Sequence, residues 1–320
     1  MKDLNFYQIF ITGTGKYLTE LLSRGLGGVI FFSKDITSES EFKNFVLDVK
    51  KQAFIPPFIS IDQEGGRVER TENIYPRRLP MKQAYTLGED YLKKQTQEMA
   101  EELQNLGFNL NFAPVADVNT NPNNPIIGER AFGNNPEDVI KGVKIVSECY
   151  LQNKIIPCVK HYPGHGDASQ DSHKTLPKIN LDLETMEKYH LPPFRFAVNN
   201  GIPMIMIAHL DCNCFNENGI PTSLSHNAIQ FLRKNIGFKG IIISDDMNMG
   251  GVNYLPPLEA AIKAIKAGVD ILLYRNSDEE TFNIICELKK IANKDNELKI
   301  AITHSIQRIM SLKQSSGLIQ

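Results

Sequence analysis

The sequence predicts an α/β protein folded as a single (β/α)₈ barrel of the TIM type. Eight short β-branched or aromatic runs alternate with helical patterns along all 320 residues. Most of these runs are apolar without alternation, as expected of parallel strands that are covered on both faces. No linker, repeat or low-complexity segment divides the chain. We therefore expect one catalytic domain spanning residues 1–320.

The predicted strands are spaced so that a helix fits between successive strands. They cover residues 7–11, 28–32, 57–61, 110–114, 155–159, 204–208, 240–244 and 269–273. The alternative fold is a doubly wound sheet with a phosphate-binding loop after its first strand. The loop at that place, Thr12-Gly13-Thr14-Gly15-Lys16, lacks the third correctly spaced glycine of that fingerprint. We interpret this loop as structural and favour the barrel.

Several of the intervening helices have recognisable ends. Ser38-x-x-Glu41 is a capping box that precedes an apolar stripe at helical spacing. A second stripe, from Leu92 to Leu106, stops at Gly107, the usual residue after a helix. Asn135-Pro136-Glu137 combines an N-cap, a first-turn proline and an acid at the positive end of the helix dipole. Ser225 and Gly237 enclose a fourth predicted helix.

Composition excludes several classes of protein. The 35 basic and 37 acidic residues give a net charge of −2, which is unlike the basic surface that nucleic-acid binding requires. No run approaches the length of a membrane span, and the early Asp3 disrupts any signal peptide. The five cysteines are odd in number and form no C-x-x-C pair, which favours reduced thiols. We expect a cytoplasmic monomer with no membrane or nucleic-acid partner.

In a (β/α)₈ barrel, the functional residues sit at the C-terminal ends of the strands, and the reactive residues of this chain fall there. Four of the seven histidines lie in these loops, namely His161, His165, His173 and His209. The segments that follow strands three to seven are 62–70, 119–133, 160–173, 209–211 and 244–246. This clustering predicts a polar site at one end of the barrel.

The loop after the fifth strand holds a candidate acid/base pair. Asp171 and His173 are separated by one small residue, so that the carboxylate can hydrogen-bond the imidazole and raise its basicity. Such a histidine can donate and accept a proton near neutral pH. Two alternatives are a hydrogen bond that only stabilises the loop, and a metal site that also uses His161, His165 and Asp167. Sensitivity to EDTA distinguishes a metal site from a His-Asp pair.

Asp245 and Asp246 directly follow the seventh predicted strand, and adjacent side chains of an extended chain point to opposite faces. One acid should face the barrel axis as a nucleophile or electrostatic partner, and the other should anchor the loop. Lys160, Arg70 and Arg130 supply cations around the same opening. They could bind hydroxyl groups or keep a central carboxylate ionised.

Four motifs of the sequence resemble those of the family 3 glycoside hydrolases. The specific resemblance is to the single-barrel β-N-acetylglucosaminidases of bacterial cell-wall recycling. The motifs are DQEGGRV at 62–68, GERAFG at 128–133, KHYPGHGD at 160–167 with DSH at 171–173, and SDDMNM at 244–249. The Asp-Ser-His element marks this branch rather than the β-glucosidases of the family. Tyr162 stands where phenylalanine is often found.

The resemblance implies a retaining mechanism without a cofactor or metal. Asp245 would be the nucleophile, and His173 the general acid/base oriented by Asp171. The hydroxyl groups of the terminal sugar would be held by Asp62, Arg70, Arg130, Lys160 and His161. A retaining glycosidase ordinarily uses a second carboxylate as its acid. Imidazolium is a good acid near its unperturbed pKa, so a histidine can take this role beside a carboxylate nucleophile.

The resemblance further implies an exo-acting enzyme that releases N-acetylglucosamine (GlcNAc) from muropeptide-type fragments or disaccharides. Two other classes remain open, a metal-dependent barrel hydrolase and a non-catalytic sugar-binding barrel. The substrate's own acetamido oxygen could also replace Asp245 as nucleophile, and phosphate could compete with water. Because the chain contains no tryptophan, we expect charged and amide groups to hold the sugar.

Overall fold

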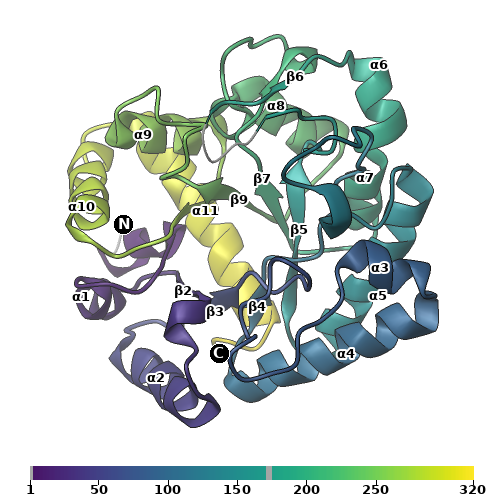
Figure 1. The fold of residues 1–320 in the computed structure, drawn as a ribbon. Helices are drawn as coiled ribbons and strands as arrows, with labels where there is room; N and C mark the ends of the chain where they lie inside the picture. Colours follow the sequence, from purple (N-terminus) through teal and green to yellow (C-terminus); the bar gives the residue numbers. More distant parts are fainter. Residues whose placement is uncertain (1–2, 171–174) are drawn as a thin grey trace.

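The computed structural model describes residues 3–170 and 175–320, and a closed barrel of parallel strands occupies its centre (Figure 1). In the described residues the barrel has the strand order β1-β10-β9-β7-β5-β4-β3-β2. These strands are β1 (Phe10–Thr12), β2 (Gly28–Phe31), β3 (Phe58–Ile61), β4 (Leu110–Asn111), β5 (Ile156–Tyr162), β7 (Met204–Ile207), β9 (Ile241–Asp246) and β10 (Ile271–Tyr274). The predicted (β/α)₈ barrel is confirmed.

The barrel closes between its first and last strands, where Phe10 pairs with Leu272 and Thr12 with Tyr274. Every residue of β2, β3 and β7 is buried, since the side chains of one face fill the barrel and those of the other pack against helices. This double coverage explains why the strand sequences are apolar without alternation.

The first predicted strand begins too early. Residues 7–9 belong to a 3₁₀ helix, η1 (Asp3–Ile9), and only the end of the predicted run enters the barrel. Tyr7 and Ile9 are buried and η1 contacts the last helix, so the apolar pattern reflects burial rather than strand geometry. The sequence pattern did not predict β6 (Lys178–Ile179) and β8 (Asp211–Cys212), which form a separate two-stranded sheet.

Helices surround the barrel (Figure 1). They are α1 (Leu18–Ser23), α2 (Glu39–Gln52), α3 (Met81–Thr86), α4 (Glu89–Leu106), α5 (Pro136–Gln152), α6 (Leu183–Thr185), α7 (Pro192–Asn199), α8 (His226–Gln230), α9 (Pro257–Ala267), α10 (Glu279–Ala292) and α11 (Asn296–Ser315). Short 3₁₀ segments are η2 (Ser33–Asp35), η3 (Gly128–Arg130), η5 (Asn213–Phe215) and η6 (Thr222–Leu224), and π-helical segments are η4 (Met186–His190) and η7 (Phe231–Asn235).

The predicted helix ends are found where expected. The side chains of Ser38, Asn135 and Ser225 each accept a hydrogen bond from the backbone N–H three residues later. Gly107 ends α4 in the left-handed region, with φ of 88°. The fourth predicted helix is shared between α8 and the π-helical η7.

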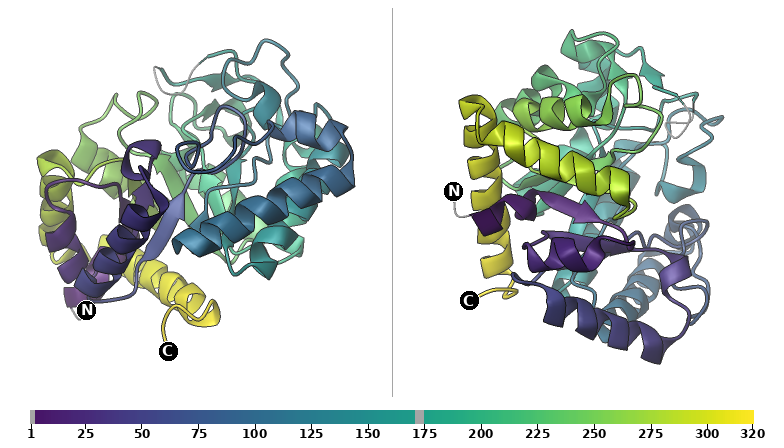
Figure 2. Two further views of the ribbon diagram at one scale, coloured as in Figure 1. Left: turned by 60° about the horizontal axis from the view of Figure 1, so that its bottom comes forward. Right: turned by 90° about the vertical axis from the view of Figure 1, so that its left-hand side faces the viewer.

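The last helix, α11, crosses the N-terminal end of the barrel; it lies behind the strands in Figure 1 and at the bottom of the left view in Figure 2. Its Lys313 is fully buried, and the ammonium group donates to the carbonyl oxygens of Gly27 and Pro56, at 2.9 and 2.8 Å, which precede β2 and β3. It also donates to Oε1 of Gln8 at 2.7 Å. This lysine therefore joins the two ends of the chain beneath the barrel.

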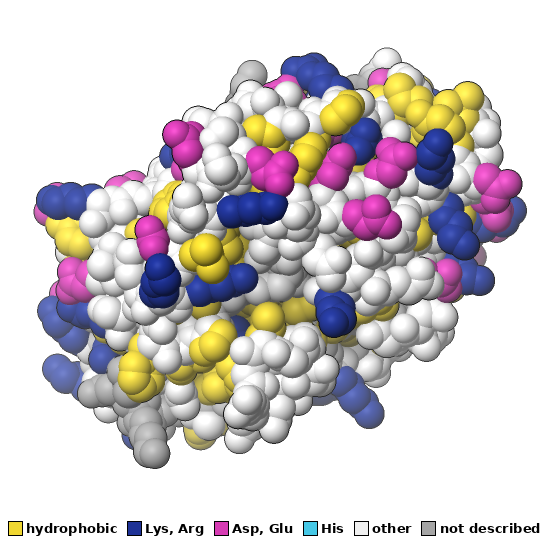
Figure 3. Space-filling model, turned by 90° about the horizontal axis from the view of Figure 1, so that it is seen from below, with side chains coloured by type: hydrophobic (Ala, Val, Ile, Leu, Met, Phe, Trp, Pro, Cys, Tyr) yellow, Lys and Arg dark blue, Asp and Glu magenta, His cyan; other side chains and the backbone are white. Residues whose placement is uncertain are grey.

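The surface of the described residues carries charges of both signs. On the face seen from below, basic and acidic side chains are interspersed with apolar ones (Figure 3). No helix in the described part of the chain is long and apolar enough to cross a membrane.

Candidate active site

A cavity of about 410 Å³ lies at the C-terminal ends of the barrel strands, and we call it the main cavity. Its lining includes six residues that the sequence predicted for the site: Asp62, Arg70, Arg130, Lys160, His161 and Asp245. Asp62 and Arg70 follow β3, Arg130 lies in η3, Lys160 and His161 belong to β5, and Asp245 belongs to β9. The closed barrel brings these elements together. Asp171 and His173, the predicted acid/base pair, lie outside the described residues.

Glu64 organises the cations of the main cavity, and its side chain is only 1% exposed. Arg130 donates to both carboxylate oxygens of Glu64, from Nε at 2.7 Å and from Nη2 at 2.8 Å. Lys160 Nζ lies 2.6 Å from Oε1 of Glu64 and 2.6 Å from Oδ1 of Asp62. One buried carboxylate thus fixes both cations, and Lys160 in turn fixes Asp62.

The charges of this cluster stabilise one another. Burial alone would raise the pKa of Glu64, but Arg130 and Lys160 outweigh burial and hold that pKa far below its usual value. Burial opposes the charged form of Lys160, yet Asp62 and Glu64 raise the pKa of its ammonium above the ordinary value. Glu64, Arg130 and Lys160 therefore stay charged at neutral pH, and the two cations can bind hydroxyl groups.

Asp117 positions His161 from behind the cavity, and the sequence analysis did not single it out. It follows β4, is 0% exposed, and its Oδ2 lies 2.7 Å from Nδ1 of His161. Nη2 of Arg130 lies 3.4 Å from Nε2 of His161. Because a guanidinium only donates, this contact assigns the His161 proton to Nδ1 and makes Nε2 the acceptor of the hydrogen bond from Arg130.

Asp117 also anchors the loop after β5. Its Oδ1 accepts from the backbone N–H of His165 at 2.6 Å and from that of His161 at 3.3 Å. A Cβ at Gly166 would lie 1.7 Å from the carbonyl oxygen of Val118, so the two loops touch through backbone atoms. Burial lowers the pKa of His165 to about 4, which keeps this imidazole neutral.

The two acids of β9 separate as the sequence analysis expected. Asp245 lines the main cavity, whereas the carboxylate of Asp246 accepts a hydrogen bond from Nε of Arg275. Asp246 also accepts from the backbone N–H of Asn248, at 3.1 Å, and thereby holds the loop. Burial would raise the pKa of Asp245, but the nearby His161, His209 and Lys160 keep it below its usual value.

His209, which the sequence placed at the opening, is fully buried behind β9. Its Nε2 lies 3.1 Å from the carbonyl oxygen of Asp246 and its Nδ1 lies 2.6 Å from Oγ of Ser223. A carbonyl only accepts, so Nε2 carries the proton and Nδ1 accepts from Ser223. His209 therefore supports the end of β9 that carries Asp245, rather than lining the cavity.

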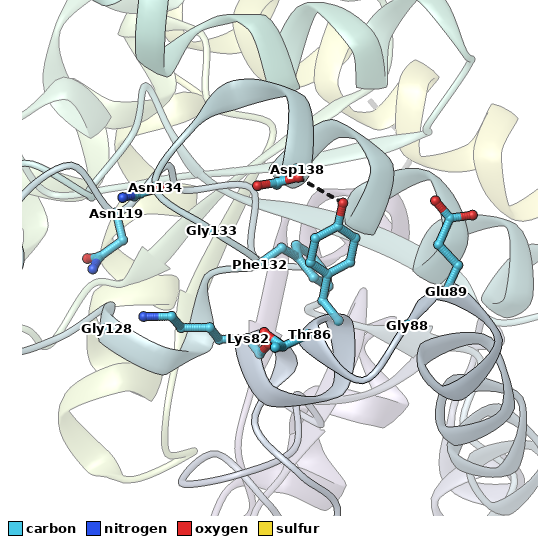
Figure 4. Close-up of a pocket in the computed structure, with 11 residues that line it drawn as sticks. Lys82, Thr86, Gly88, Glu89, Asn119, Gly128, Phe132, Gly133, Asn134 and Asp138 are labelled. Carbon is cyan, nitrogen blue, oxygen red and sulfur yellow. Dashed lines mark hydrogen bonds between the residues drawn. The ribbon is translucent and has the colours of Figure 1, made fainter.

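A larger cavity, of about 460 Å³, is lined by residues of α3, η3 and the start of α5 (Figure 4). Lys82, Asn119 and Asp138 are among its lining residues, and Tyr85 donates to Oδ1 of Asp138 at 2.9 Å. None of the predicted site residues that the structure describes lines it. We assign the active site to the main cavity, because strand-end carboxylates and cations converge there and the larger cavity has no such group among its lining residues.

Two functional residues were missed from the sequence. Glu64 lies within the quoted DQEGGRV motif, and its place two residues after Asp62 was the available signal. Asp117 follows the fourth strand in an apolar stretch, where a lone acid points to a buried, paired carboxylate. As to the metal alternative, the described residues contain no group of three or more His, Cys, Asp or Glu arranged to hold a metal ion.

A family model and known relatives of this chain indicate the same family. Residues 12–312 match the model of the glycosyl hydrolase family 3 N-terminal domain. Beta-hexosaminidase A of Pseudoalteromonas piscicida is 32% identical over 289 residues, covering 80% of this chain and 47% of that protein. A beta-hexosaminidase of Neisseria meningitidis serogroup C is 33% identical over 269 residues, covering 80% of this chain and 73% of the relative.

A solved structure agrees closely with the fold. The family 3 β-N-acetylglucosaminidase of Paenibacillus sp. str. FPU-7 superposes with a TM-score of 0.93 at 28% identity, covering 99% of this chain and 63% of that chain. This chain therefore spans less than two thirds of the Paenibacillus protein and about half of the Pseudoalteromonas protein.

Proposed function

The chain belongs to glycosyl hydrolase family 3, and on that premise we propose that it is a retaining exo-β-N-acetylglucosaminidase. The observation that carries the proposal is the position of Asp245, a strand-end carboxylate facing a cavity with an ordered set of cations. The β-hexosaminidases and the β-N-acetylglucosaminidase named above support the choice of sugar.

Asp245 is the nucleophile in this proposal. Its carboxylate attacks the anomeric carbon, and the bond from that carbon to the leaving oxygen breaks, which gives a covalent glycosyl-enzyme. A lowered pKa keeps Asp245 ionised at neutral pH. It forms no ion pair with another described residue, so its charge is available to the oxocarbenium-like transition state.

His173, oriented by Asp171, supplies the proton in this proposal. The imidazolium protonates the leaving oxygen in the first step, and the resulting imidazole deprotonates water in the second. The sequence supports this assignment, because the pair follows β5, which also delivers Lys160 and His161 to the main cavity.

The remaining predicted residues hold the terminal sugar. Lys160, Arg130 and Arg70 donate to sugar hydroxyls, and Asp62 accepts from them. Nε2 of His161 accepts from a hydroxyl in place of its 3.4 Å contact with Arg130. The cluster around Glu64 supports this role, since its cations are fixed before the substrate arrives and lose little conformational freedom on binding.

We propose muropeptide-type fragments as the natural substrate, with a cytoplasmic location, a monomeric state and no cofactor. The support comes from the Asp-Ser-His element at 171–173 and from the composition of the chain. Release of GlcNAc from a purified muropeptide, followed by mass spectrometry, tests the substrate.

The experiment that tests the activity uses an aryl β-GlcNAc substrate. The wild-type protein should release the aryl alcohol at the same rate with and without EDTA, and Asp245→Asn should abolish release. Loss of activity in EDTA would instead favour a metal-dependent hydrolase. Binding of GlcNAc without turnover would favour a sugar-binding barrel.

A second variant tests the acid. His173→Ala should lower kcat/KM by about 10²- to 10⁴-fold for a poor leaving group, because protonation of the leaving oxygen is lost. The loss should shrink for a dinitrophenyl leaving group, which departs without protonation. An equal loss for both leaving groups would contradict the role of His173.

A further inference from the structure

Two cysteines lie one residue apart in the segment that follows β7, and the proposed mechanism uses neither of them. Cys212 ends β8 and is 2% exposed, whereas Cys214 lies in η5 and is only partly buried. Both thiols are free. Because two residues of chain span at most about 7 Å, and a 3₁₀ turn spans less, the Cα atoms of the pair lie within reach of a disulfide.

The two thiols contact each other. The thiol of Cys212 donates a hydrogen bond to the sulfur of Cys214, which lowers the pKa of Cys214. The same hydrogen bond, together with burial, raises the pKa of Cys212 well above its ordinary value. The thiol that solvent can reach therefore ionises more readily, and the buried thiol beside it stays protonated. A peroxide-reactive cysteine next to a resolving cysteine has this arrangement.

The sheet of β6 and β8 joins the cysteine pair to the chain that follows the proposed acid. The N–H of Asp211, in β8, donates to the carbonyl oxygen of Pro177 at 2.9 Å. Nδ2 of Asn213, the residue between the two cysteines, donates to Oδ1 of Asn180 at 2.9 Å. Pro177 comes shortly after His173 in the sequence. A shift of the backbone between the cysteines is therefore transmitted to the chain just after His173.

The segment η5 also packs against a strand of the main cavity. The ring centroid of Phe215, at the end of η5, lies 6.4 Å from that of Tyr162 in β5. The hydroxyl of Tyr162 donates to the carbonyl oxygen of Ala228 at 3.1 Å, which fixes the ring. Tyr162 directly follows His161. The surroundings of the cysteine pair are thus in contact with the strand that carries His161.

We propose that Cys212 and Cys214 form a reversible disulfide on exposure to hydrogen peroxide, and that this disulfide lowers activity by displacing the chain just after His173. The inference goes beyond the proposed function and rests on it only for the role of His173. A disulfide holds its sulfur atoms about 2 Å apart, closer than two thiols can approach, so the backbone between the cysteines must adjust.

The oxidation proceeds in two steps. The thiolate of Cys214 attacks one oxygen of hydrogen peroxide and breaks the O–O bond, which gives a sulfenic acid and a hydroxide ion. The hydroxide takes up the proton that Cys214 had released. The sulfur of Cys212 then attacks the sulfenic sulfur, and the sulfenic hydroxyl leaves with the proton of Cys212 as water. Two thiols are oxidised to a disulfide, and one peroxide is reduced to two waters.

Treatment of the reduced protein with hydrogen peroxide tests this site. After alkylation, mass spectrometry should find the peptide that carries both cysteines unalkylated and lighter by two hydrogen atoms, and dithiothreitol should restore both thiols. Oxidation should lower kcat/KM for an aryl β-GlcNAc with a poor leaving group by about 10-fold, a part of the roughly 10²- to 10⁴-fold that acid catalysis supplies. The loss should shrink to within about 2-fold for a dinitrophenyl leaving group.

Two variants serve as controls. Cys214→Ser cannot form the disulfide, so it should be as active as the reduced wild type and keep its activity in peroxide. Cys286→Ser removes another partly buried thiol, on α10, and should remain as sensitive to peroxide as the wild type.

The inference would be overturned if the disulfide does not form, if it forms without a loss of activity, or if Cys214→Ser loses as much activity in peroxide as the wild type. An equal loss for the two leaving groups would also contradict it. Lack of turnover by the reduced protein would instead overturn the proposed function and, with it, the effect on acid catalysis. The mass spectrum would still decide whether the disulfide forms.

Discussion

At the scale of single residues, the site depends on two carboxylates that are almost completely buried. Asp117 fixes the tautomer of His161 and anchors the backbone of His165. Glu64 fixes Arg130 and Lys160. Both acids act through the residues that they hold. Replacing either acid should therefore misplace the imidazole or the cations that it positions.

Asp117→Asn tests this positioning. The neutral amide weakens a charge-assisted hydrogen bond to Nδ1 of His161, so KM for an aryl β-GlcNAc should rise by about 10-fold with a smaller change in kcat. Asp167→Asn is the matched control, because Asp167 lies in the loop after β5 that Asp117 anchors and accepts only from Oγ1 of Thr120 among the partners described. A similar change in both variants would contradict the role of Asp117.

The residues that were predictable and those that were not differ in a physical way. Asp62, Arg130 and Asp245 follow predicted strands, and strand ends meet at one end of a barrel whatever the details of packing. Glu64 and Asp117 depend on which cation or imidazole faces them, which only the closed barrel determines. His209 has the residue type and sequence position of a cavity residue, but its side chain is buried and contacts the backbone carbonyl of Asp246 in β9.

At the scale of elements, the loops after β4 and β5 act as one unit. The backbone N–H of Asn121 donates to the carbonyl oxygen of Gly166, and Nδ2 of Asn124 donates to that of His165 at 2.8 Å. Arg130 lies in η3, at the end of the first loop, and His161 lies in β5, just before the second loop. The geometry of the main cavity therefore depends on close packing between two loops.

Gly166→Ala should separate these loops. A Cβ there would lie 1.7 Å from the carbonyl oxygen of Val118, so the backbone must move. We expect a loss of stability of about 1–3 kcal/mol, measured by urea unfolding, together with reduced activity. Gly201→Ala is the control, because its left-handed φ of 71° adds strain but nothing lies within 4 Å of the new Cβ. An equal loss in both variants would contradict the close contact.

Elements were predicted best where burial and local signals agree. The N-caps of α2 and α5 and the glycine after α4 are local signals, and the structure confirms them. Residues 7–9 are buried in either conformation, so their apolar pattern could not distinguish a 3₁₀ helix from a strand. The two-residue strands β6 and β8 are too short to produce a pattern.

At the scale of the whole molecule, α11 closes the base of the barrel through Lys313. The ammonium group has three oxygen acceptors and no acidic partner among the described residues. Burial lowers the pKa of Lys313 to about 7. Lys313 joins the first and last helical segments, η1 and α11, and its ammonium group gains or loses a proton near neutral pH.

This titration predicts a pH dependence of stability. Between about pH 7 and pH 10 the native lysine has lost its proton while the unfolded lysine keeps it. The unfolded state then binds more protons, so the free energy of unfolding should rise with pH, by up to about 1.4 kcal/mol per pH unit. Lys313→Met should lack this rise when urea unfolding is compared across the range. Parallel pH profiles for the two proteins would contradict the depressed pKa.

The proposed mechanism depends on Asp245 as a covalent nucleophile rather than an electrostatic partner. A 2-deoxy-2-fluoro glycoside with an activated leaving group should trap the glycosyl-enzyme, and mass spectrometry of the digested protein should find the label on Asp245 and not on Asp246. Turnover of an aryl β-GlcNAc with no carboxylate labelled, or a label on another residue, would contradict covalent catalysis by Asp245.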